Sequence, residues 1–158
     1  MSYQLDDIDA HILALLQEDG RMQRNAISEQ VGLSVSAVSE RMSKLEAHGI
    51  IARYHAVLDA KRLGVDITAF IRVSVDGSEH YDRFVTTVTA MDEVLEVHSI
   101  TGEGSHILKV RTQNTTTLER LLSRFQALPG VSGTSTSIVL SSFKETRTLP
   151  VQGSDATS

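Results

Sequence analysis

The stretch NAISEQVGLSVSAVSERMSKLEAHGII, residues 25–51, decides the fold of the N-terminal part of this chain. Its pattern predicts two helices, over 25–31 and 36–48, joined at Gly32. Glycine suits that position because it adopts the left-handed conformation that ends a helix without a side-chain clash. Gly49 is expected to end the second helix in the same way. The stretch therefore predicts a pair of short helices joined by a tight turn.

Each of these two helices is expected to begin at a capping residue. Asn25 is expected to cap the first helix, and either Ser34 or Ser36 the second, because their side-chain oxygens can accept from the free N–H groups of a first turn. An earlier helix is predicted from Asp6 or Asp7 to Asp19, with Asp6 as its cap. That helix carries an apolar stripe suited to a core, made of Ile8, Ile12, Leu15 and Leu16.

The second helix of the pair has two different faces. Val38, Met42 and Leu45 recur with the helical period, which predicts a stripe packed against a core. The opposite face is small, polar and basic and holds Ser36, Ser39, Glu40, Arg41 and Lys44. Such a pair of helices is typical of a helix-turn-helix, whose second helix reads base edges in the major groove. An ordinary helical hairpin with a solvated charged face has the same spacing, so the stretch alone leaves both interpretations open.

The segment 51–58 alternates like a short strand, which predicts a strand or wing after the helices. Arg53 in this segment could contact backbone phosphates, and a plain connecting strand is the alternative. Residues 1–60 thus form a predicted winged helix-turn-helix domain, followed by a linker over 61–66.

Residues 67–143 show the order strand, helix, strand, strand, helix, strand. This order predicts a ferredoxin-like βαββαβ sandwich, so the whole chain belongs to the α+β class. One sheet face would be covered by helices, while the other offers Phe70, His98 and a row of Thr and Ser. A half-apolar exposed face predicts association with another copy. Residues 144–158 form a polar C-terminal tail, of which we expect the last part, 150–158, to be disordered.

Bulk properties narrow the classes of function. The net charge is −5, which argues against a protein that coats nucleic acid non-specifically. Basic residues concentrate in 20–53, which contains five Lys or Arg residues and three Glu residues, for a net charge of +2. This charge is modest, so tight DNA binding would need several copies of the protein. The chain contains no cysteine, its N-terminus lacks the pattern of a signal peptide, and no stretch is apolar enough to span a bilayer. The expected location is the cytoplasm, with no membrane partner.

Residues that could support catalysis are scarce. The six histidines show no paired ligand spacing, and no serine lies in a nucleophile-elbow motif. Gly102 and Gly104 follow a predicted strand, but no helix begins there to bind a phosphate. The sequence therefore predicts no enzyme, no metal site and no cofactor.

Several separate segments together resemble the Lrp/AsnC (leucine-responsive, or feast/famine) family of transcriptional regulators. They are Leu5-Asp6-Asp7-Ile8-Asp9, Asp19-Gly20-Arg21, Arg41 with Leu45-Glu46, Gly49-Ile50-Ile51 and Thr101-Gly102-Glu103. The likeness covers about residues 3–142. It implies a DNA-binding regulator whose C-terminal RAM domain pairs into dimers, and further into tetramers or octamers. The predicted contacts with double-stranded DNA are Ser34, Ser36, Ser39, Glu40, Arg41, Lys44 and Arg53. For Arg41, an ion pair that braces the helix is the alternative role.

The resemblance also implies a small effector, usually an amino acid, bound near the predicted hairpin loop. The implied effector-binding residues are His98, Gly102, Glu103, Gly104, Ser105, His106, Thr134 and Thr136. Many family members carry an aromatic residue and then Asp where this chain has Gly104 and Ser105. The acid expected to hold an ammonium group is missing, which leaves Glu103 as the local carboxylate. Simple amino acids are therefore expected to bind weakly, with a bulkier ligand or none as the alternative.

A second hypothesis from another class remains at this stage. The ferredoxin-like part could be a metabolite-binding module or small enzyme, with the N-terminal helices used only for assembly. An assembly helix should expose apolar residues on the outer face of 36–48, whereas this face carries Ser, Glu, Arg and Lys. The composition of that face favours DNA binding.

Overall fold

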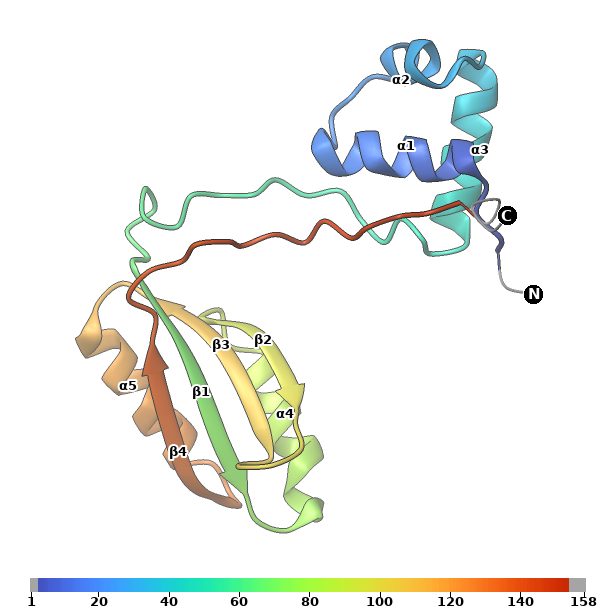
Figure 1. The fold of residues 1–158 in the computed structure, drawn as a ribbon. Helices are drawn as coiled ribbons and strands as arrows, with labels where there is room; N and C mark the ends of the chain where they lie inside the picture. The colour runs from blue at the N-terminus through green and yellow to red at the C-terminus, as the bar shows by residue number, and fades with distance from the viewer. Residues whose placement is uncertain (1–2, 154–158) are drawn as a thin grey trace. The chain divides into compact units, whose positions relative to one another are not determined.

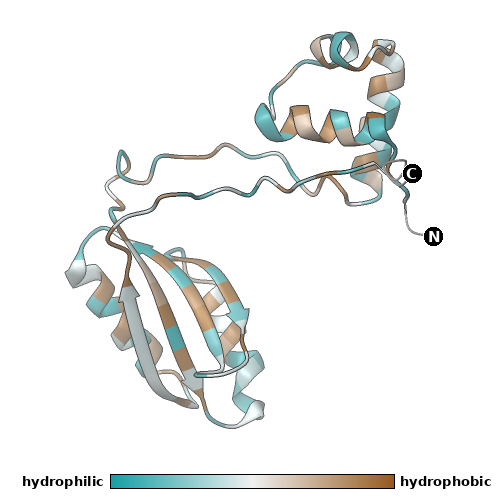
Figure 2. Ribbon diagram, in the orientation of Figure 1, coloured by the Kyte–Doolittle hydropathy of each residue, from teal (hydrophilic) through white to brown (hydrophobic). Residues whose placement is uncertain are grey.

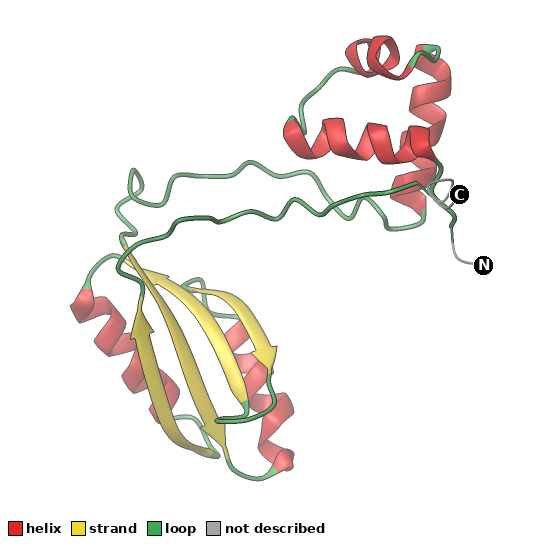
Figure 3. Ribbon diagram, viewed as in Figure 1, coloured by secondary structure: helices red, strands yellow, loops and turns green. Residues whose placement is uncertain are grey.

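The computed structural model describes residues 3–153, and these residues form two compact units (Figure 1). The first unit contains the chain up to Val57 and the C-terminal segment that begins at Glu145, and the second is Leu58–Lys144. The chain thus crosses from one unit to the other twice. The first unit is helical and the second is an α+β sandwich (Figure 3).

The first unit holds helices α1 (Asp7–Glu18), α2 (Arg24–Val31) and α3 (Val35–Ala47). As predicted, Asp6 caps α1, because its carboxylate accepts from the N–H of Asp9 at 2.7 Å. Ser34 caps α3 by accepting from the N–H of Ala37 at 3.2 Å. Gly32 ends α2 with a φ of 71°, in the left-handed conformation expected of it.

The predicted cap of α2 was wrong. The helix begins one residue earlier than expected, at Arg24, and the flanking residue Gln23 makes no side-chain capping bond. Asn25 therefore lies inside the first turn, where its own carbonyl accepts from the hydroxyl of Ser28 at 2.7 Å. A helix without a side-chain cap leaves N–H groups of its first turn to solvent or to a ligand.

Apolar residues of the three helices meet in one small core. The buried members are Ile12, Leu13, Leu16, Ile27, Val38, Met42 and Leu45. The stripe predicted on α3 supplies the last three of them, and Ile12 and Leu16 come from the stripe predicted on α1. Burying aliphatic side chains of this kind contributes about 1.5–3 kcal/mol each, so this core fixes how α3 lies against α1.

The strand predicted over Ile51–Leu58 is not formed. Residues 52–59 have no regular secondary structure, although the segment is extended in Figure 1. Alternating sequence suits a strand, but a strand also needs a neighbouring strand to share its hydrogen bonds. Between 52 and 58, no backbone hydrogen bond to another part of the described chain is found.

The second unit is a four-stranded antiparallel sheet with two helices. Its elements are β1 (Ile67–Val75), α4 (Tyr81–Thr89), β2 (Val94–Ser99), β3 (His106–Thr112), α5 (Thr115–Gln126) and β4 (Val131–Ile138), with a short 3-10 turn over Ser78–His80. The strand order is β2-β3-β1-β4, and every neighbouring pair is antiparallel. This is the predicted ferredoxin-like βαββαβ topology, and both helices lie on one side of the sheet in Figure 3.

Alternation along the strands separates the two sheet faces. On β1, Ala69, Ile71 and Val73 are fully buried, while Phe70 is 39% exposed. The alternating brown and teal bands along the strands in Figure 2 show the same pattern. The buried set packs against α4 and α5 through Phe84, Val88, Leu118, Leu121 and Phe125. The core of this unit therefore lies on the helix side, and Phe70 faces outward.

The described residues of the C-terminal tail contact the helical unit, although we expected residues 150–158 to be disordered. Gln17 of α1 donates from Nε2 to the carbonyl of Leu149 at 3.0 Å, and its Oε1 accepts from the N–H of Leu149 at 2.7 Å. Val151 packs against the core of the helical unit. The polar composition of the tail predicts solvation, but it does not show that Gln17 of α1 offers hydrogen-bond partners to the backbone of the tail. Residues 154–158 of the tail lie outside the described part.

Candidate nucleic-acid interface

Helix α3 presents a hydrophilic face of small and charged side chains. Ser34, Ser36, Glu40 and Lys44 are exposed and Ser39 is half-buried. The hydroxyls of Ser34 and Ser36 lie 3.0 Å apart at the start of the helix. The start of such a helix is where base edges are read in a helix-turn-helix complex, so these hydroxyls lie where donors and acceptors are needed.

Arg41 does not lie free on that face. Its Nη1 donates to Oδ2 of Asp6 at 2.7 Å and to Oδ1 of Asp9 at 2.8 Å. Tyr3 donates from its hydroxyl to the other oxygen of Asp9 at 2.9 Å. Asp9 is 1% exposed, so the network anchors a buried carboxylate between α1 and α3. The geometry favours the bracing role for Arg41 over direct contact with a base.

The charges of this network support one another. The hydrogen bonds that the Arg41 guanidinium donates to Asp6 and then to Asp9 raise the pKa of that guanidinium. Burial opposes ionisation of Asp6, but the N–H of Asp9 and the guanidinium outweigh it and hold the pKa of Asp6 below its usual value. Burial, together with the bond to Asp9, raises the pKa of Tyr3. At neutral pH the network therefore holds one cation and ionised Asp6 beside a neutral phenol.

Two of the predicted cations keep access to solvent. Lys44 pairs with Glu40 on the next turn of α3 at 2.7 Å, and both side chains are more than half exposed. The hydrogen bond from Lys44 lowers the pKa of Glu40. Such an exposed pair exchanges partners readily, so Lys44 can turn to a phosphate. Arg53 is exposed in the segment that follows α3.

The sequence reasoning missed the beginning of α2 and the apolar member of the α3 face. Arg24 and Asn25 are exposed in the first turn of α2, whose N-terminal N–H groups lack a side-chain cap. Val35 is 45% exposed at the first position of α3. The uncapped helix start can bind a phosphate, and an exposed valine can contact a thymine methyl group. Arg24 could have been predicted as a phosphate contact from the sequence, because it is a basic residue beside the expected start of a helix.

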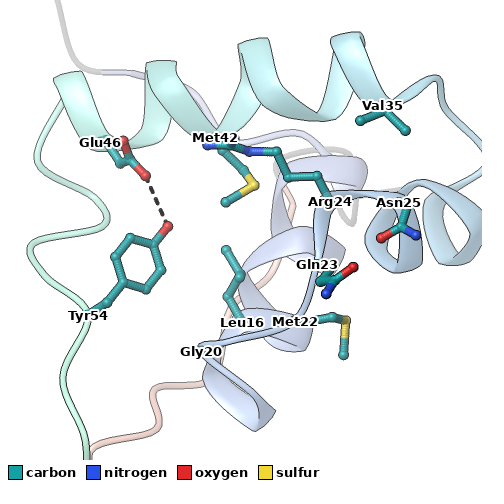
Figure 4. A pocket seen from close by; sticks show the side chains of 10 residues that line it. All are labelled: Leu16, Gly20, Met22, Gln23, Arg24, Asn25, Val35, Met42, Glu46 and Tyr54. Atoms are coloured by element: carbon teal, nitrogen blue, oxygen red, sulfur yellow. Dashed lines mark hydrogen bonds between the residues drawn. The ribbon is translucent and has the colours of Figure 1, made fainter.

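These residues border a cavity of about 550 Å³ within the helical unit (Figure 4). Its lining consists of Leu16, Gly20, Met22, Gln23, Arg24, Asn25, Val35, Met42, Glu46 and Tyr54. Tyr54 donates to Oε1 of Glu46 at 3.0 Å across one end, as the dashed line in Figure 4 shows. Burial, and then Glu46, raise the pKa of Tyr54 to about 12. The bond holds the segment after α3 against the end of that helix.

In the second unit, the predicted effector loop spans the turn between β2 and β3. Gly102 and Gly104 have φ values of 98° and 80°, a conformation that residues with a side chain avoid. Glu103 between them is exposed. The hydroxyl of Ser105 instead turns to β1, where it accepts from the N–H of Val75 at 3.0 Å and donates to the carbonyl of Val73 at 3.1 Å. Ser105 therefore fastens the loop to the sheet.

The structure divides the other predicted effector residues between the two faces of the sheet. Thr134, Val73 and His106 occupy one row across three strands, and burial of Val73 places that row on the helix side. His98 pairs with Ile107 one position along, on the opposite face, with its Nε2 3.5 Å from Glu96. Thr134 accepts from Gln126 of α5 at 3.1 Å. Thr136 is opposite the buried Ile71, so it too lies on the helix side.

His106 is the most unusual residue of this group. It is 1% exposed and lies between the rings of Tyr81 and Phe84, with centroid distances of 5.1 and 5.0 Å. Its Nδ1 lies 2.8 Å from the Ser105 hydroxyl, while its Nε2 finds no hydrogen-bond partner among the described residues. Because the Ser105 proton goes to Val73, the proton of this contact belongs to His106 Nδ1. Burial lowers the pKa of His106, which is neutral at pH 7.

The described residues offer little for other chemistry. Between residues 3 and 153, no group of three or more His, Asp or Glu side chains is placed to hold a metal ion. Within the same range, no helix is both long and apolar enough to cross a membrane.

Comparisons with known proteins agree for both units. A family model described as winged helix-turn-helix DNA-binding matches residues 5–52, and one described as Lrp/AsnC ligand binding domain matches residues 68–149. The HTH-type transcriptional regulator FL11 of Pyrococcus horikoshii is 37% identical over 152 residues, covering 96% of this chain and all of the relative. The leucine-responsive regulatory protein of Escherichia coli K12 is 32% identical over 151 residues, covering 94% of this chain and 92% of the relative.

Solved structures extend the likeness to three dimensions. A transcriptional regulator of Neisseria meningitidis, determined as its L-Met complex, is 33% identical with a TM-score of 0.90, over 93% of this chain and 97% of that one. Escherichia coli AsnC is 27% identical with a TM-score of 0.88, over 94% of this chain and all of that one. The ligand-binding family model matches more than half of this chain, and the two relatives, both above 30% identity, align with almost all of it. This chain therefore belongs to the Lrp/AsnC family of DNA-binding transcriptional regulators.

Proposed function

We propose that this protein binds specific double-stranded DNA sites in the cytoplasm through the exposed face of α3 and acts by binding rather than by catalysis. The observation that carries the proposal is the contrast between Arg41 and its neighbours. Arg41 fixes α3 against α1 through Asp6 and Asp9, while Ser36 and Lys44 remain exposed. A reading helix needs a rigid mounting as well as free side chains.

The contacts proposed with DNA fall into two groups. Ser34, Ser36, Ser39, Glu40 and Val35 lie where base edges would be read, with serine contributing hydrogen bonds and valine contributing apolar contact. Lys44, Arg53 and Arg24 are exposed cations that would neutralise phosphates. Arg41 moves from the base-reading group, where the sequence placed it, to a supporting role.

We further propose that the protein acts as a dimer or larger even-numbered assembly. The outer sheet face exposes Phe70, and the segments that flank the sandwich expose Val57 and Phe143 almost completely, at 92% and 97%. Apolar side chains left exposed in this number mark association surfaces. A two-fold dimer would recognise a palindromic site with half-sites about one helical turn, or a multiple of it, apart.

The sandwich is proposed to bind a small effector related to an amino acid at the loop 101–105. The Neisseria regulator was determined with L-Met, and the relative from Rhizobium radiobacter is named a proline dehydrogenase transcriptional activator. In this chain the exposed carboxylate of Glu103 is available to an ammonium group, while the glycines allow close approach of backbone N–H groups to a carboxylate. Because Ser105 is committed to β1, it does not replace the acid found in many relatives.

The test is a binding titration with the DNA upstream of the protein's own gene against random DNA of the same length. We expect specific binding at least about 1,000-fold tighter than random binding at physiological salt. If a dimer neutralises about six phosphates, the logarithm of affinity should fall with that of salt concentration with a slope of about −5. Equal affinity for both DNAs would contradict the proposal.

A further inference from the structure

The described part of the C-terminal tail lies along helix α1 in the opposite direction to the helix. Leu149 is held by Gln17, near the end of α1, and Gly153 lies against Asp7, the first residue of that helix. The four residue steps from Leu149 to Gly153 reach about 13 Å when extended, and the ten steps of helix from Gln17 back to Asp7 rise about 15 Å. The two lengths agree, so residues 149–153 span α1 from end to end. We refer to these residues as the strap.

Three kinds of contact hold the strap. The amide of Gln17 pairs with both the N–H and the C=O of Leu149, which is the way a neighbouring strand would bind an extended chain. Val151 packs against the core formed by Ile12, Leu16 and their neighbours. A side chain at position 153 would overlap the backbone of Asp7, so only glycine fits there.

The far end of the strap reaches the network that mounts α3. Asp7 lies between Asp6 and Asp9, the two residues that hold the Arg41 guanidinium. A backbone packed against Asp7 restricts fraying of the first turn of α1, which is the part of a helix that opens most readily. Docking of the strap on α1 therefore helps to fix the position of α3, because Asp6 and Asp9 of the same turn hold Arg41 of α3.

The near end of the strap leads back to the sandwich. The match to the ligand-binding family model ends at residue 149, and β4 ends at Ile138, so only a short segment separates the sheet from the strap. The amide bonds to Leu149 are solvent-exposed and Val151 is only partly buried, so the strap can detach without unfolding α1.

We propose that residues 149–153 are an intramolecular strap whose docking on α1 steadies the Asp6–Arg41–Asp9 network and so holds α3 ready for DNA, and whose release weakens DNA binding. The part that concerns DNA rests on the proposed function, whereas the docking itself can be tested without any DNA. The strap gives the helical unit a second covalent connection to the ligand-binding sandwich, besides the linker before β1.

Docking is tested by hydrogen exchange of the full-length chain. The N–H of Leu149 should exchange about fivefold or more slowly than in an unstructured peptide, because Gln17 accepts its hydrogen bond. Gln17→Ala and Val151→Ser should remove this protection. Gln152→Ser, which alters an exposed neighbour, should keep it. An unprotected Leu149 N–H in the unaltered protein, or protection that survives both Gln17→Ala and Val151→Ser, would overturn the strap.

The functional part is tested by operator affinity of the same variants. Gln17→Ala, Val151→Ser and a chain that ends at Lys144 should each bind the specific site about fivefold or more weakly, with Gln152→Ser unchanged. Lost protection at Leu149 with unchanged affinity would refute the regulatory role and leave the DNA-binding function intact. An unaltered protein without preference for its own upstream DNA would instead refute the proposed function.

The absence of cysteine allows a direct test of which chain supplies the strap. A Gln17→Cys, Leu149→Cys double variant treated with a short bismaleimide should give a cross-link within one chain, which mass spectrometry would show as a single chain that carries one reagent and no free thiol. The single variant Gln17→Cys is the control. When Val151→Ser is added to this double variant, the cross-link should restore the DNA affinity that Val151→Ser removes, because it holds the strap on α1. A product at the mass of two chains would show that the strap comes from a second copy, against the proposal.

Discussion

Arg41 of α3 lies 2.8 Å from Asp9 of α1, a carboxylate that is only 1% exposed. The two residues are far apart in sequence, and their contact fixes the helix that carries the proposed DNA-reading face. A buried carboxylate tolerates ionisation only with such partners. The same arginine is therefore required for the shape of the interface while being withdrawn from its surface.

Arg41→Ala should destabilise the helical unit by about 3 kcal/mol, because Asp9 would remain buried without its cation. Arg41→Lys should recover only part of the loss, since one ammonium group cannot reproduce the planar fork of donors. Thermal and urea unfolding would measure both changes. An Arg41→Ala protein as stable as the unaltered one would show that the contact with Asp9 does not hold α3 in solution.

Lys44→Ala should leave the stability almost unchanged, because the pair with Glu40 is exposed. We expect weaker binding to all DNA sequences alike, and a salt slope that is less steep by about 1 for each lost phosphate contact. Fluorescence titrations at several salt concentrations would measure it. Arg120→Ala, on the exposed side of α5 in the sandwich, is the control, since Arg120 is assigned no DNA contact. A loss confined to one base position would instead make Lys44 a base-reading residue.

His106 should make the sandwich sensitive to acid. Burial lowers its pKa in the folded state, so the unfolded chain binds the proton more readily, and stability falls as the pH drops below the ordinary histidine value of 6.5. Tyr81 and Ser105 face the ring, and neither supplies a negative charge. Urea unfolding at pH 7.5 and pH 5.5 would measure the change.

His106→Phe should remove most of this pH dependence, because the phenyl ring fits between Tyr81 and Phe84 and does not titrate. The matched control is His98→Gln, which alters an exposed histidine of the same sheet and should keep the pH dependence. An identical difference between the two pH values in the unaltered protein and in His106→Phe would assign the effect to other groups.

Phe70→Asp should reduce self-association, because it adds a charge to the middle of the outer sheet face. Light scattering at micromolar concentration should report a smaller particle than the unaltered assembly. Thr116→Asp, on the exposed side of α5, is the control and should leave the mass unchanged. An unaltered protein with the mass of a single chain would contradict the proposed assembly.

Glu103→Gln should weaken any ligand that carries an ammonium group by about tenfold, the value of a hydrogen bond to a charged group. A thermal-shift series over the common amino acids would detect this as lost stabilisation. Glu119→Gln, on an exposed position of α5, is the control. Strong stabilisation by an amino acid that survives Glu103→Gln would place the ligand elsewhere in the sandwich.

Local chemistry was enough to predict most of the elements. Asp6, Ser34 and Gly32 fulfil the capping roles assigned to them, because a cap involves only residues within one helical turn. The apolar stripes on α1 and α3 likewise follow from a spacing that each helix carries in its own sequence. The failed strand over 51–58 shows the boundary of such reasoning, since strand formation depends on a partner.

The sequence by itself determined the order of the helices and strands on both sides of the linker, the caps of α1 and α3, and the small polar face of α3. The tertiary structure decided the partners: Arg41 turned to Asp6 and Asp9, His106 turned beneath α4, and Leu149 was bound by Gln17. The physical reason is the range of the interactions. Helical periodicity and capping act within a few residues, whereas ion pairs and backbone docking join segments that only packing brings together.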